Sequence, residues 1–203
     1  KLEEMGEASG ADISEEAGAF CRQRGCRDVR QVPEAGLPFA TGEFDAVLSL
    51  DVLEHVADDR AALREYLRVA RPGGVLLLTV PAYSWLWSVH DDLNRHRRRY
   101  LRSPLRSLLS SAGWEIERLS YFCTLLFPPV AAVRLAFRLL RRERPGLEFK
   151  IPGQLLNRAC RNVFASEAAW LRRADFPFGS SLLAVARKPR TKSACPQTSS
   201  LEP

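Results

Sequence analysis

The sequence has 203 residues, of which 46% are apolar and 27% charged, an ordinary globular composition that suits one domain with an appended subregion. Residues 1–10 are polar and lack the apolar stretch that a signal peptide needs. Residues 1–59 carry a net charge of −9 and residues 60–203 a net charge of +15, for a total of +6. The basic part suits nucleic acid, a membrane surface or an anionic substrate, or it forms an ordinary solvated face.

The cysteines indicate a reducing compartment. An odd count without a secretion signal favours free thiols in the cytoplasm. None forms a Cys-x-x-Cys pair or has the spacing to histidine of a zinc site, so we expect no metal. The five are Cys21, Cys26, Cys123, Cys160 and Cys195.

The first part of the chain alternates between strand-like and helical segments. Ser14 is placed to cap a helix whose first turn carries two glutamates, which the helix dipole favours. The expected elements are a strand over 8–11, a helix over 15–24, and strands over 28–32 and 44–50.

The rest of the chain continues this alternation. An apolar stripe at helical spacing predicts a helix over 59–71, which Pro72 and Gly73 should end. The run VLLLTVP that follows is continuously apolar, as in strands buried on both faces of a parallel sheet. The remaining expected elements are a helix over 101–112 and strands over 114–121 and 180–187. Short links between strands and helices predict an α/β fold with a doubly wound sheet.

Two aspartates directly follow predicted strands. Ligands of open α/β sheets bind beyond the carboxyl ends of the strands, where Asp12 and Asp51 should lie. A carboxylate in this place can accept hydrogen bonds from ribose hydroxyls. A turn or cap role is the alternative for each.

Three motifs carry a family resemblance. The segments GADIS, LPFATGEFDAVLSLDVLEHV and RVARPGGVLLLTVP, in this order, resemble class I S-adenosylmethionine-dependent methyltransferases, especially the bacterial group similar to ubiquinone- and menaquinone-biosynthesis methyltransferases. The resemblance covers about residues 10–121, and Ser180–Arg187 resembles the last, antiparallel strand of the family. It implies a Rossmann-like, mostly parallel sheet with S-adenosylmethionine as the cofactor.

The resemblance also implies roles for single residues. Asp12 would bind the ribose hydroxyls, and Ile13 would lie against the adenine. Glu54 and His55 fit loop-fixing hydrogen bonds at least as well as direct contact with a ligand. The other implied cofactor residues are Leu37 and Pro38 beside the adenine, and Asp51, Val52 and Leu53 at the methionine end.

The sequence departs from the family pattern in two places. The first strand and the Gly-rich loop are absent, so we expect an N-terminally truncated core in which residues 1–6 end a helix. Where the family usually has an aspartate for the adenine amino group, this chain has Pro33 and Glu34, and Glu34 is the candidate replacement.

Residues 81–100 form the expected substrate side. His90 and His96 are candidate general bases, since the pKa of histidine lies near operating pH. Alternatively, the aromatic residues only pack a lid and the arginines pair with the acidic first third. The candidate substrate residues are Tyr83, Trp87, Asp91, Arg98 and Tyr100.

Residues 121–140 are apolar but do not fit a membrane span. Pro128 and Pro129 should break a helix, and Arg134 and Arg138 would each cost about 2.5–3.5 kcal/mol at the bilayer centre. A helix from Val130 would form a substrate lid or lie on an anionic membrane interface. The expected organisation is a partial core over 1–122, an inserted helical lid or membrane-contact region over 123–178, the last core strand over 179–188 and a disordered tail over 189–203.

The sequence therefore predicts a methyltransferase that acts on a small-molecule or lipid-linked acceptor in the cytoplasm, with peripheral contact to the inner face of the membrane as a second expectation. Nucleic acid is not expected, because no helix-turn-helix or RNA-recognition motif is present. An NAD-type oxidoreductase is one alternative, since Asp12 would serve that ribose equally well. A non-catalytic fragment that binds anionic surfaces is the other.

Overall fold

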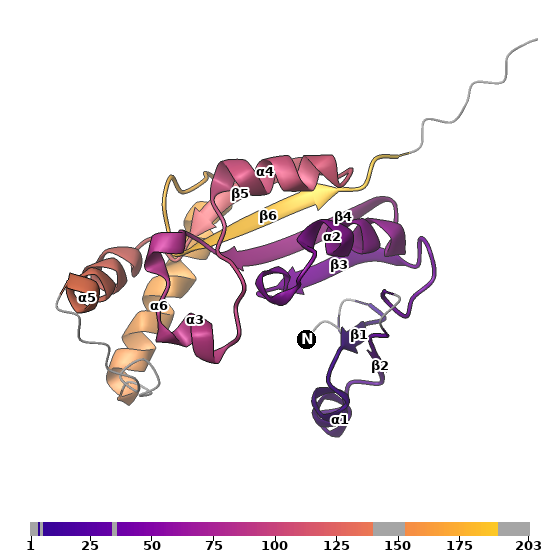
Figure 1. Ribbon diagram of the computed structural model, residues 1–203, viewed down its shortest axis with the longest axis horizontal. Coiled ribbons are helices and arrows are strands. Elements are labelled where there is room, and N and C mark those ends of the chain that lie inside the picture. The colour runs from indigo at the N-terminus through magenta and orange to yellow at the C-terminus, as the bar shows by residue number, and fades with distance from the viewer. Residues whose placement is uncertain (1–3, 5, 34–35, 140–152, 191–203) are drawn as a thin grey trace, which may run out of the picture.

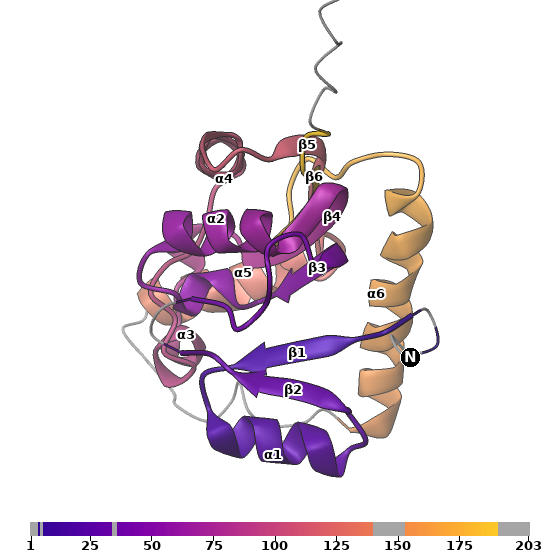
Figure 2. The same cartoon turned by 90° about the vertical axis from the view of Figure 1, so that its right-hand side faces the viewer.

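The computed structural model describes residues 4, 6–33, 36–139 and 153–190 and contains two sheets (Figure 1). A parallel pair, β1 and β2, lies beside a four-stranded sheet of order β3-β4-β6-β5 (Figure 2). In the larger sheet β3 and β4 are parallel, and β6 is antiparallel to both β4 and β5. The strands are β1 (Ser9–Asp12), β2 (Asp28–Gln31), β3 (Phe44–Leu50), β4 (Ala70–Pro81), β5 (Glu115–Phe122) and β6 (Ser181–Arg187).

The helices lie between these strands in the expected order. The α/β Rossmann-like fold with an antiparallel last strand is thereby confirmed. The helices are α1 (Glu15–Gln23), α2 (Asp59–Val69), α3 (Val89–Leu93), α4 (Arg102–Ser111), α5 (Phe127–Leu139) and α6 (Gln154–Leu171), with short 3₁₀ turns η2 (Leu53–His55) and η3 (Ser84–Leu86).

The start of α1 and the end of α2 can be compared with the boundaries predicted from sequence. Ser14 caps α1 as predicted, and its hydroxyl accepts a hydrogen bond from the N–H of Ala17 at 3.2 Å. The predicted end of the second helix at residue 71 was wrong, because α2 stops at Val69 and β4 begins at Ala70, before the proline and glycines. The ladder to β3 includes Ala70 and resumes at Val75 after an irregularity, so the segment that was expected to be a turn lies within the strand, and pairing with β6 begins at Val75.

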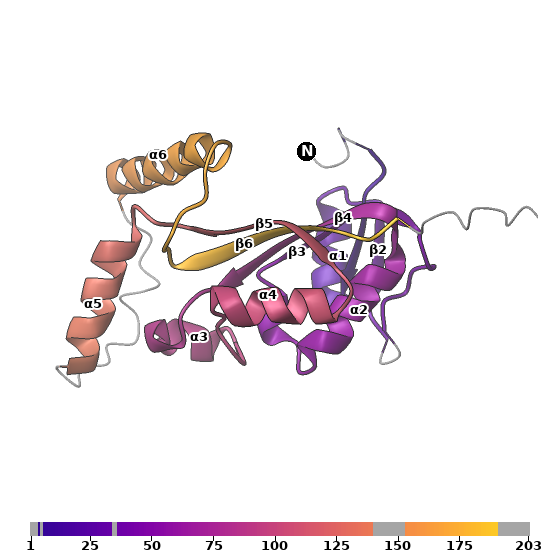
Figure 3. The ribbon, with the colours of Figure 1, turned by 90° about the horizontal axis from the view of Figure 1, so that it is seen from above.

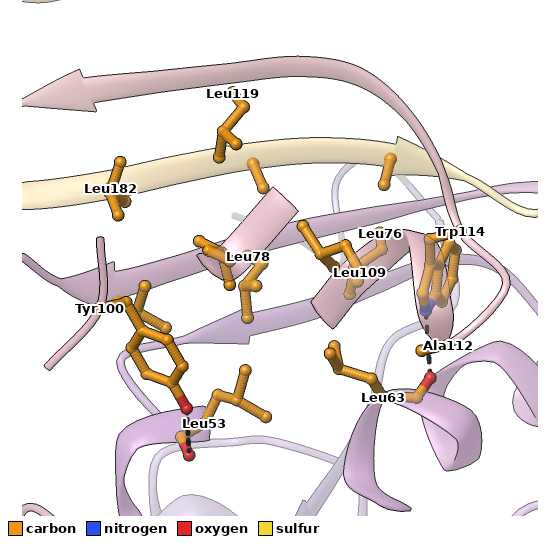
Figure 4. Packing of buried hydrophobic residues seen from close by; sticks show 14 of the residues in the cluster. Leu53, Leu63, Leu76, Leu78, Tyr100, Leu109, Ala112, Trp114, Leu119 and Leu182 are labelled. Carbon is orange, nitrogen blue, oxygen red and sulfur yellow. Dashed lines mark hydrogen bonds between the residues drawn. The ribbon is translucent and has the colours of Figure 1, made fainter. Parts of the chain in front are cut away.

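One face of the larger sheet carries the hydrophobic core. Helices α2 and α4 both lie on this face (Figure 3), and their leucines pack onto β4 (Figure 4). Within β4, Leu76, Leu78 and Val80 are fully buried, and the residues between them are only partly buried. The prediction that this strand is buried on both faces was therefore wrong. Alternating burial is typical of a sheet covered on one face.

The core includes a buried side-chain hydrogen bond that a single substitution can remove. The indole Nε1 of Trp114, which is 2% exposed, donates to the carbonyl of Leu63 in α2 at 3.0 Å (Figure 4). We expect Trp114→Phe to lower the free energy of unfolding by about 1–2 kcal/mol, from the lost hydrogen bond and the smaller ring. Urea unfolding followed by circular dichroism measures this loss, and a variant as stable as the wild type would contradict it.

The helix predicted to begin at Val130 begins earlier. Helix α5 starts at Phe127, so Pro128 and Pro129 occupy its first turn. As expected, no described helix over residues 121–139 passes through these prolines. Only the expected start at Val130 was wrong, by three residues, because the first N–H groups of a helix have no partner within it and proline loses nothing there. Over the part of the chain that the structure describes, no helix is long and apolar enough to cross a membrane.

Candidate functional site

The first acidic residue, Asp12, closes β1 and already has a local partner. Its Oδ1 accepts a hydrogen bond from the N–H of Ser14 at 2.8 Å, so it fixes the turn into α1. Ile13, between them, is 80% exposed, which leaves its side chain accessible to a ligand. The turn role is thus present, and the roles of Asp12 and Ile13 in cofactor binding stay predictions.

The segment with Leu37 and Pro38 is tied down by charged side chains. The N–H of Leu37 donates to Glu65 at 3.1 Å, and its carbonyl accepts from Arg68 at 3.0 Å. The carbonyl of Pro38 accepts from Arg30 at 2.9 Å. These bonds fix the backbone of the segment, and the place of Leu37 and Pro38 beside an adenine stays a prediction. Residue 34, the candidate replacement for the adenine-binding aspartate, lies outside the described residues.

Asp51 ends β3 in a strained conformation. Its φ of 53° is in the left-handed region, which is uncommon for a residue other than glycine. The strand geometry holds it there, because its N–H donates to the carbonyl and the hydroxyl of Thr79 at 3.0 and 3.1 Å. Such strain is often found at functional sites. Val52 is 45% exposed beside it, whereas Leu53 is fully buried in the core and has a packing role, and the part of both in cofactor binding stays a prediction.

Glu54, which follows, is a buried carboxylate without a partner. It is 1% exposed, and neither of its side-chain oxygens accepts a hydrogen bond from the described part of the chain. Burial raises its pKa to about 7, and the nearby charges of Asp51 and Asp91 act in the same direction. Buried carboxylates are normally paired, so this group indicates a function. The sequence pattern left a loop-fixing role and direct contact with a ligand both open for it.

Residues 97–100 are bonded to the turn that contains Glu54. The N–H of Arg97 donates to the carbonyl of Glu54 at 2.9 Å, and its Nε donates to the carbonyl of His55 at 3.0 Å. Arg98 forms an ion pair with Asp59 at 2.8 Å. The alternative that arginines pair with the acidic first third is confirmed for Arg98.

Tyr100 completes this attachment. It is 6% exposed, and its hydroxyl donates to Asp59 at 3.1 Å. Burial, together with the charge of Asp59, raises the pKa of Tyr100. Arg98 and Tyr100 therefore hold the loop in place, and their contact with a substrate stays a prediction.

Asp91 is the centre of a buried ionic network. It is fully buried, and Arg99 donates two hydrogen bonds to it, at 2.8 and 2.9 Å. The N–H of Ser88 and Nδ1 of His96 also lie 2.8 Å from its carboxylate. Although burial raises the pKa of Asp91, these partners outweigh it and bring the pKa below its ordinary value. Asp91 is thus an ionised acceptor that orients His96.

The two predicted general bases have different surroundings. The side chain of His96 is 12% exposed, and its ring lies 4.7 Å from that of His55, almost perpendicular to it. The ring of His90 lies 6.4 Å from that of His96. The structure thus groups His96 with Glu54 and His55, whose possible ligand atoms all lie within 4.8 Å of one another.

The aromatic residues of this loop connect it to α5. Tyr83, with φ of 58°, stacks on Tyr121 at 5.3 Å, and its ring lies 5.7 Å from that of Phe127. Burial raises the pKa of Tyr83 to about 12. Trp87 is 38% exposed, and its indole N–H donates to Asp92 at 2.9 Å. The first turn of α5 thus packs against the loop, and the role of this region as a lid and its contact with a substrate stay predictions.

Comparison with known proteins identifies relatives of this arrangement. Residues 1–78 match the family model described as a methyltransferase domain. A probable S-adenosylmethionine-dependent methyltransferase of Mycolicibacterium smegmatis is 36% identical over 111 residues, which are 53% of this chain and 43% of that protein. A tRNA (carboxymethyluridine(34)-5-O)-methyltransferase of Xenopus tropicalis is 29% identical over 101 residues, 48% of this chain and 15% of that protein.

The fold is also that of a solved methyltransferase. The crystal structure of an S-adenosylmethionine-dependent methyltransferase from Mesorhizobium loti superimposes with a TM-score of 0.57 at 19% identity, covering 92% of this chain and 83% of that one. This similarity shows a methyltransferase-like fold. The chain spans less than half the length of the curated relatives described above.

Proposed function

We propose that the chain is the core of an S-adenosylmethionine-dependent methyltransferase. The match of residues 1–78 to a methyltransferase domain is the observation that carries this proposal. The placement of Asp12 and Asp51 at the carboxyl ends of parallel strands supports it, since ligands of such sheets bind there. The relatives favour this function over an NAD-dependent oxidation, for which Asp12 alone would be the argument.

In this proposal the chain positions the cofactor and an acceptor. Asp12 binds the ribose hydroxyls, Leu37 and Pro38 border the adenine, and Asp51 faces the methionine end. Methyl transfer from a sulfonium needs an aligned acceptor and a water-excluding site, because the leaving group is already good. In this proposal the aromatic loop and α5 provide that enclosure, and the contacts of Phe127 with Tyr83 and Trp85 support it.

The sheet indicates that the cofactor site needs a further strand. Nothing in the described ranges pairs with β3 on the side away from β4, and Leu48 and Leu50 of this strand are 42% and 48% exposed. β1 and β2 form a separate sheet. We propose that an additional strand, from sequence before Lys1, lies between β3 and the β1–β2 pair. A chain extended to include this strand would then bind S-adenosylmethionine more tightly than the 203 residues alone.

We propose a small molecule as the methyl acceptor, and the alternatives to be tested are a lipid and a nucleic acid. The name of the Xenopus relative includes a tRNA nucleoside, so nucleic acid is one arm of the test. A methyl-transfer screen with the extended chain would compare small hydroxyl and amine acceptors, lipid vesicles and tRNA, with products detected by mass spectrometry. Modification of tRNA alone would replace the small-molecule proposal.

Asp12 provides the direct test of the cofactor. We expect Asp12→Ala to weaken S-adenosylmethionine binding at least tenfold, equivalent to about 1.4 kcal/mol, because two ribose hydroxyls lose their acceptor. Calorimetry on the extended chain measures the dissociation constant, and Glu16→Ala, an exposed carboxylate four residues away, serves as the control. Since Asp12 also fixes a turn, thermal unfolding must show that the variant is folded. No binding by the wild type, or equal binding by the variant, would contradict the assignment.

A further inference from the structure

We propose that Glu54, His55 and His96 bind one divalent first-row transition-metal cation. Their candidate ligand atoms lie within 4.8 Å of one another. Two ligands of one tetrahedral zinc-like ion, each at about 2.0–2.2 Å, stand about 3.4 Å apart, so the side chains would have to rotate toward one another by about 1–1.5 Å to close the set.

The state of Glu54 is the first argument. It is almost completely buried, and both oxygens lack a hydrogen-bond donor among the described residues. A buried carboxylate in this condition is costly unless a proton or a cation compensates it. An exposed acidic cluster would not carry this inference, since water already satisfies such groups.

The orientation of His96 is the second argument. Nδ1 of His96 lies 2.8 Å from the carboxylate of Asp91, which accepts a hydrogen bond when Nδ1 carries the ring proton. In this tautomer the lone pair is on Nε2, the nitrogen available to a metal. A carboxylate that holds a histidine in this tautomer is the usual outer partner of a metal-bound histidine. Arg99 in turn fixes Asp91 with two hydrogen bonds, so the ligand is preorganised.

The local charge is the third argument. The charged groups that act on Glu54 are Asp51, Asp91 and Arg99. With Glu54 ionised, the three carboxylates are opposed by Arg99 and by Arg97, whose guanidinium bonds the carbonyl of His55, which leaves an excess of one negative charge that a cation would offset. His55 is exposed and gives the site access from solvent.

The donor set selects the kind of cation. Two imidazoles and one carboxylate suit zinc, cobalt, iron or manganese, whereas magnesium and calcium prefer oxygen ligands only. We therefore expect Zn²⁺ and Co²⁺ to bind more tightly than Mn²⁺, and Mg²⁺ to bind weakest. Three protein ligands leave coordination positions open, which is typical of catalytic rather than structural sites.

Metal titration of the chelator-treated 203-residue chain tests this proposal without S-adenosylmethionine. Calorimetry with Zn²⁺ and the visible absorption of added Co²⁺ should both show one equivalent bound. Glu54→Gln and His96→Ala should each weaken binding at least tenfold, and Asp45→Asn, a carboxylate that is 82% exposed, should not change it. The loss in Glu54→Gln cannot be attributed to unfolding, because this variant should be at least as stable as the wild type without metal.

Two results would overturn the metal site. One is the absence of stoichiometric Zn²⁺ and Co²⁺ binding to the folded wild type. The other is binding that persists unchanged in both variants, which would place the cation elsewhere, for example on cysteine thiols. Neither result bears on S-adenosylmethionine binding, so the proposed function and the metal site can fail separately.

Discussion

Asp91→Asn should lower the free energy of unfolding by about 3–5 kcal/mol, because it breaks a buried ion pair and leaves one partner charged. Asp91 is fully buried, and the side chain of Arg99 is only 5% exposed, so water cannot replace the lost carboxylate charge. Asparagine has nearly the same shape, and the loss therefore reports charge rather than a cavity. Urea unfolding at pH 7, followed by tryptophan fluorescence, measures it.

The control for this change is Asp45→Asn, which breaks an ion pair of Asp45 with Arg71 that is largely exposed. Exposed pairs contribute at most about 1 kcal/mol. If both variants lose the same small amount of stability, the buried network does not hold the loop over residues 88–99 in the way described. The larger loss in Asp91→Asn should also be accompanied by weaker binding of Zn²⁺, because His96 loses its orienting partner.

Glu54→Gln should raise the free energy of unfolding at pH 8 by about 3 kcal/mol in the presence of a chelator. The pKa of Glu54 is raised from 4.5 to about 7, a difference of about 2.5 units at 1.36 kcal/mol each. Below pH 4.5 Glu54 is protonated in both the folded and the unfolded chain, so it does not lower the free energy of unfolding. As the pH rises from 4.5 to 7, the unfolded chain ionises first, so the wild type loses stability, whereas glutamine has no proton to lose.

The measurement is urea unfolding of both proteins at pH 5 and pH 8. The difference between them should be small at pH 5 and should reach its full size at pH 8. Glu65→Gln is the control, and it should change the free energy of unfolding in the opposite direction. The hydrogen bond from Arg68 lowers the pKa of Glu65, so this partly exposed carboxylate stabilises the fold above its pKa. Parallel pH curves for the wild type and Glu54→Gln would show that Glu54 is not held in a costly buried state.

Much of the fold could be predicted from sequence because it is locally specified. The strand Phe44–Leu50 and the cap at Ser14 were predicted at the residues where the structure has them. Burial of β4 could not be predicted, since an apolar run does not reveal whether a helix covers one face of its strand or both. The same limit applies to α5, where the prolines were judged without knowing that they fall in the first turn.

The candidate metal site was missed for a different reason. Its ligands Glu54 and His55 are adjacent in sequence, but His96 is brought to them by hydrogen bonds that only the folded loop makes. Spacing rules for metal sites look for ligands close in sequence, and these lie about forty residues apart. The signal that was present is the dipeptide of Glu54 and His55 just after the predicted strand 44–50, together with a histidine in the loop that follows the next predicted strand.

The position of β6 has a consequence for how the protein is made. This strand is the last among the described residues, yet it lies between β4 and β5 and pairs with both along most of its length. During synthesis, the edges of β4 and β5 that pair with β6 therefore stay unpaired until Arg187 has left the ribosome. We expect the larger sheet to close only after residues 181–187 are synthesised, in one late step that depends on contacts about 60 to 110 residues apart.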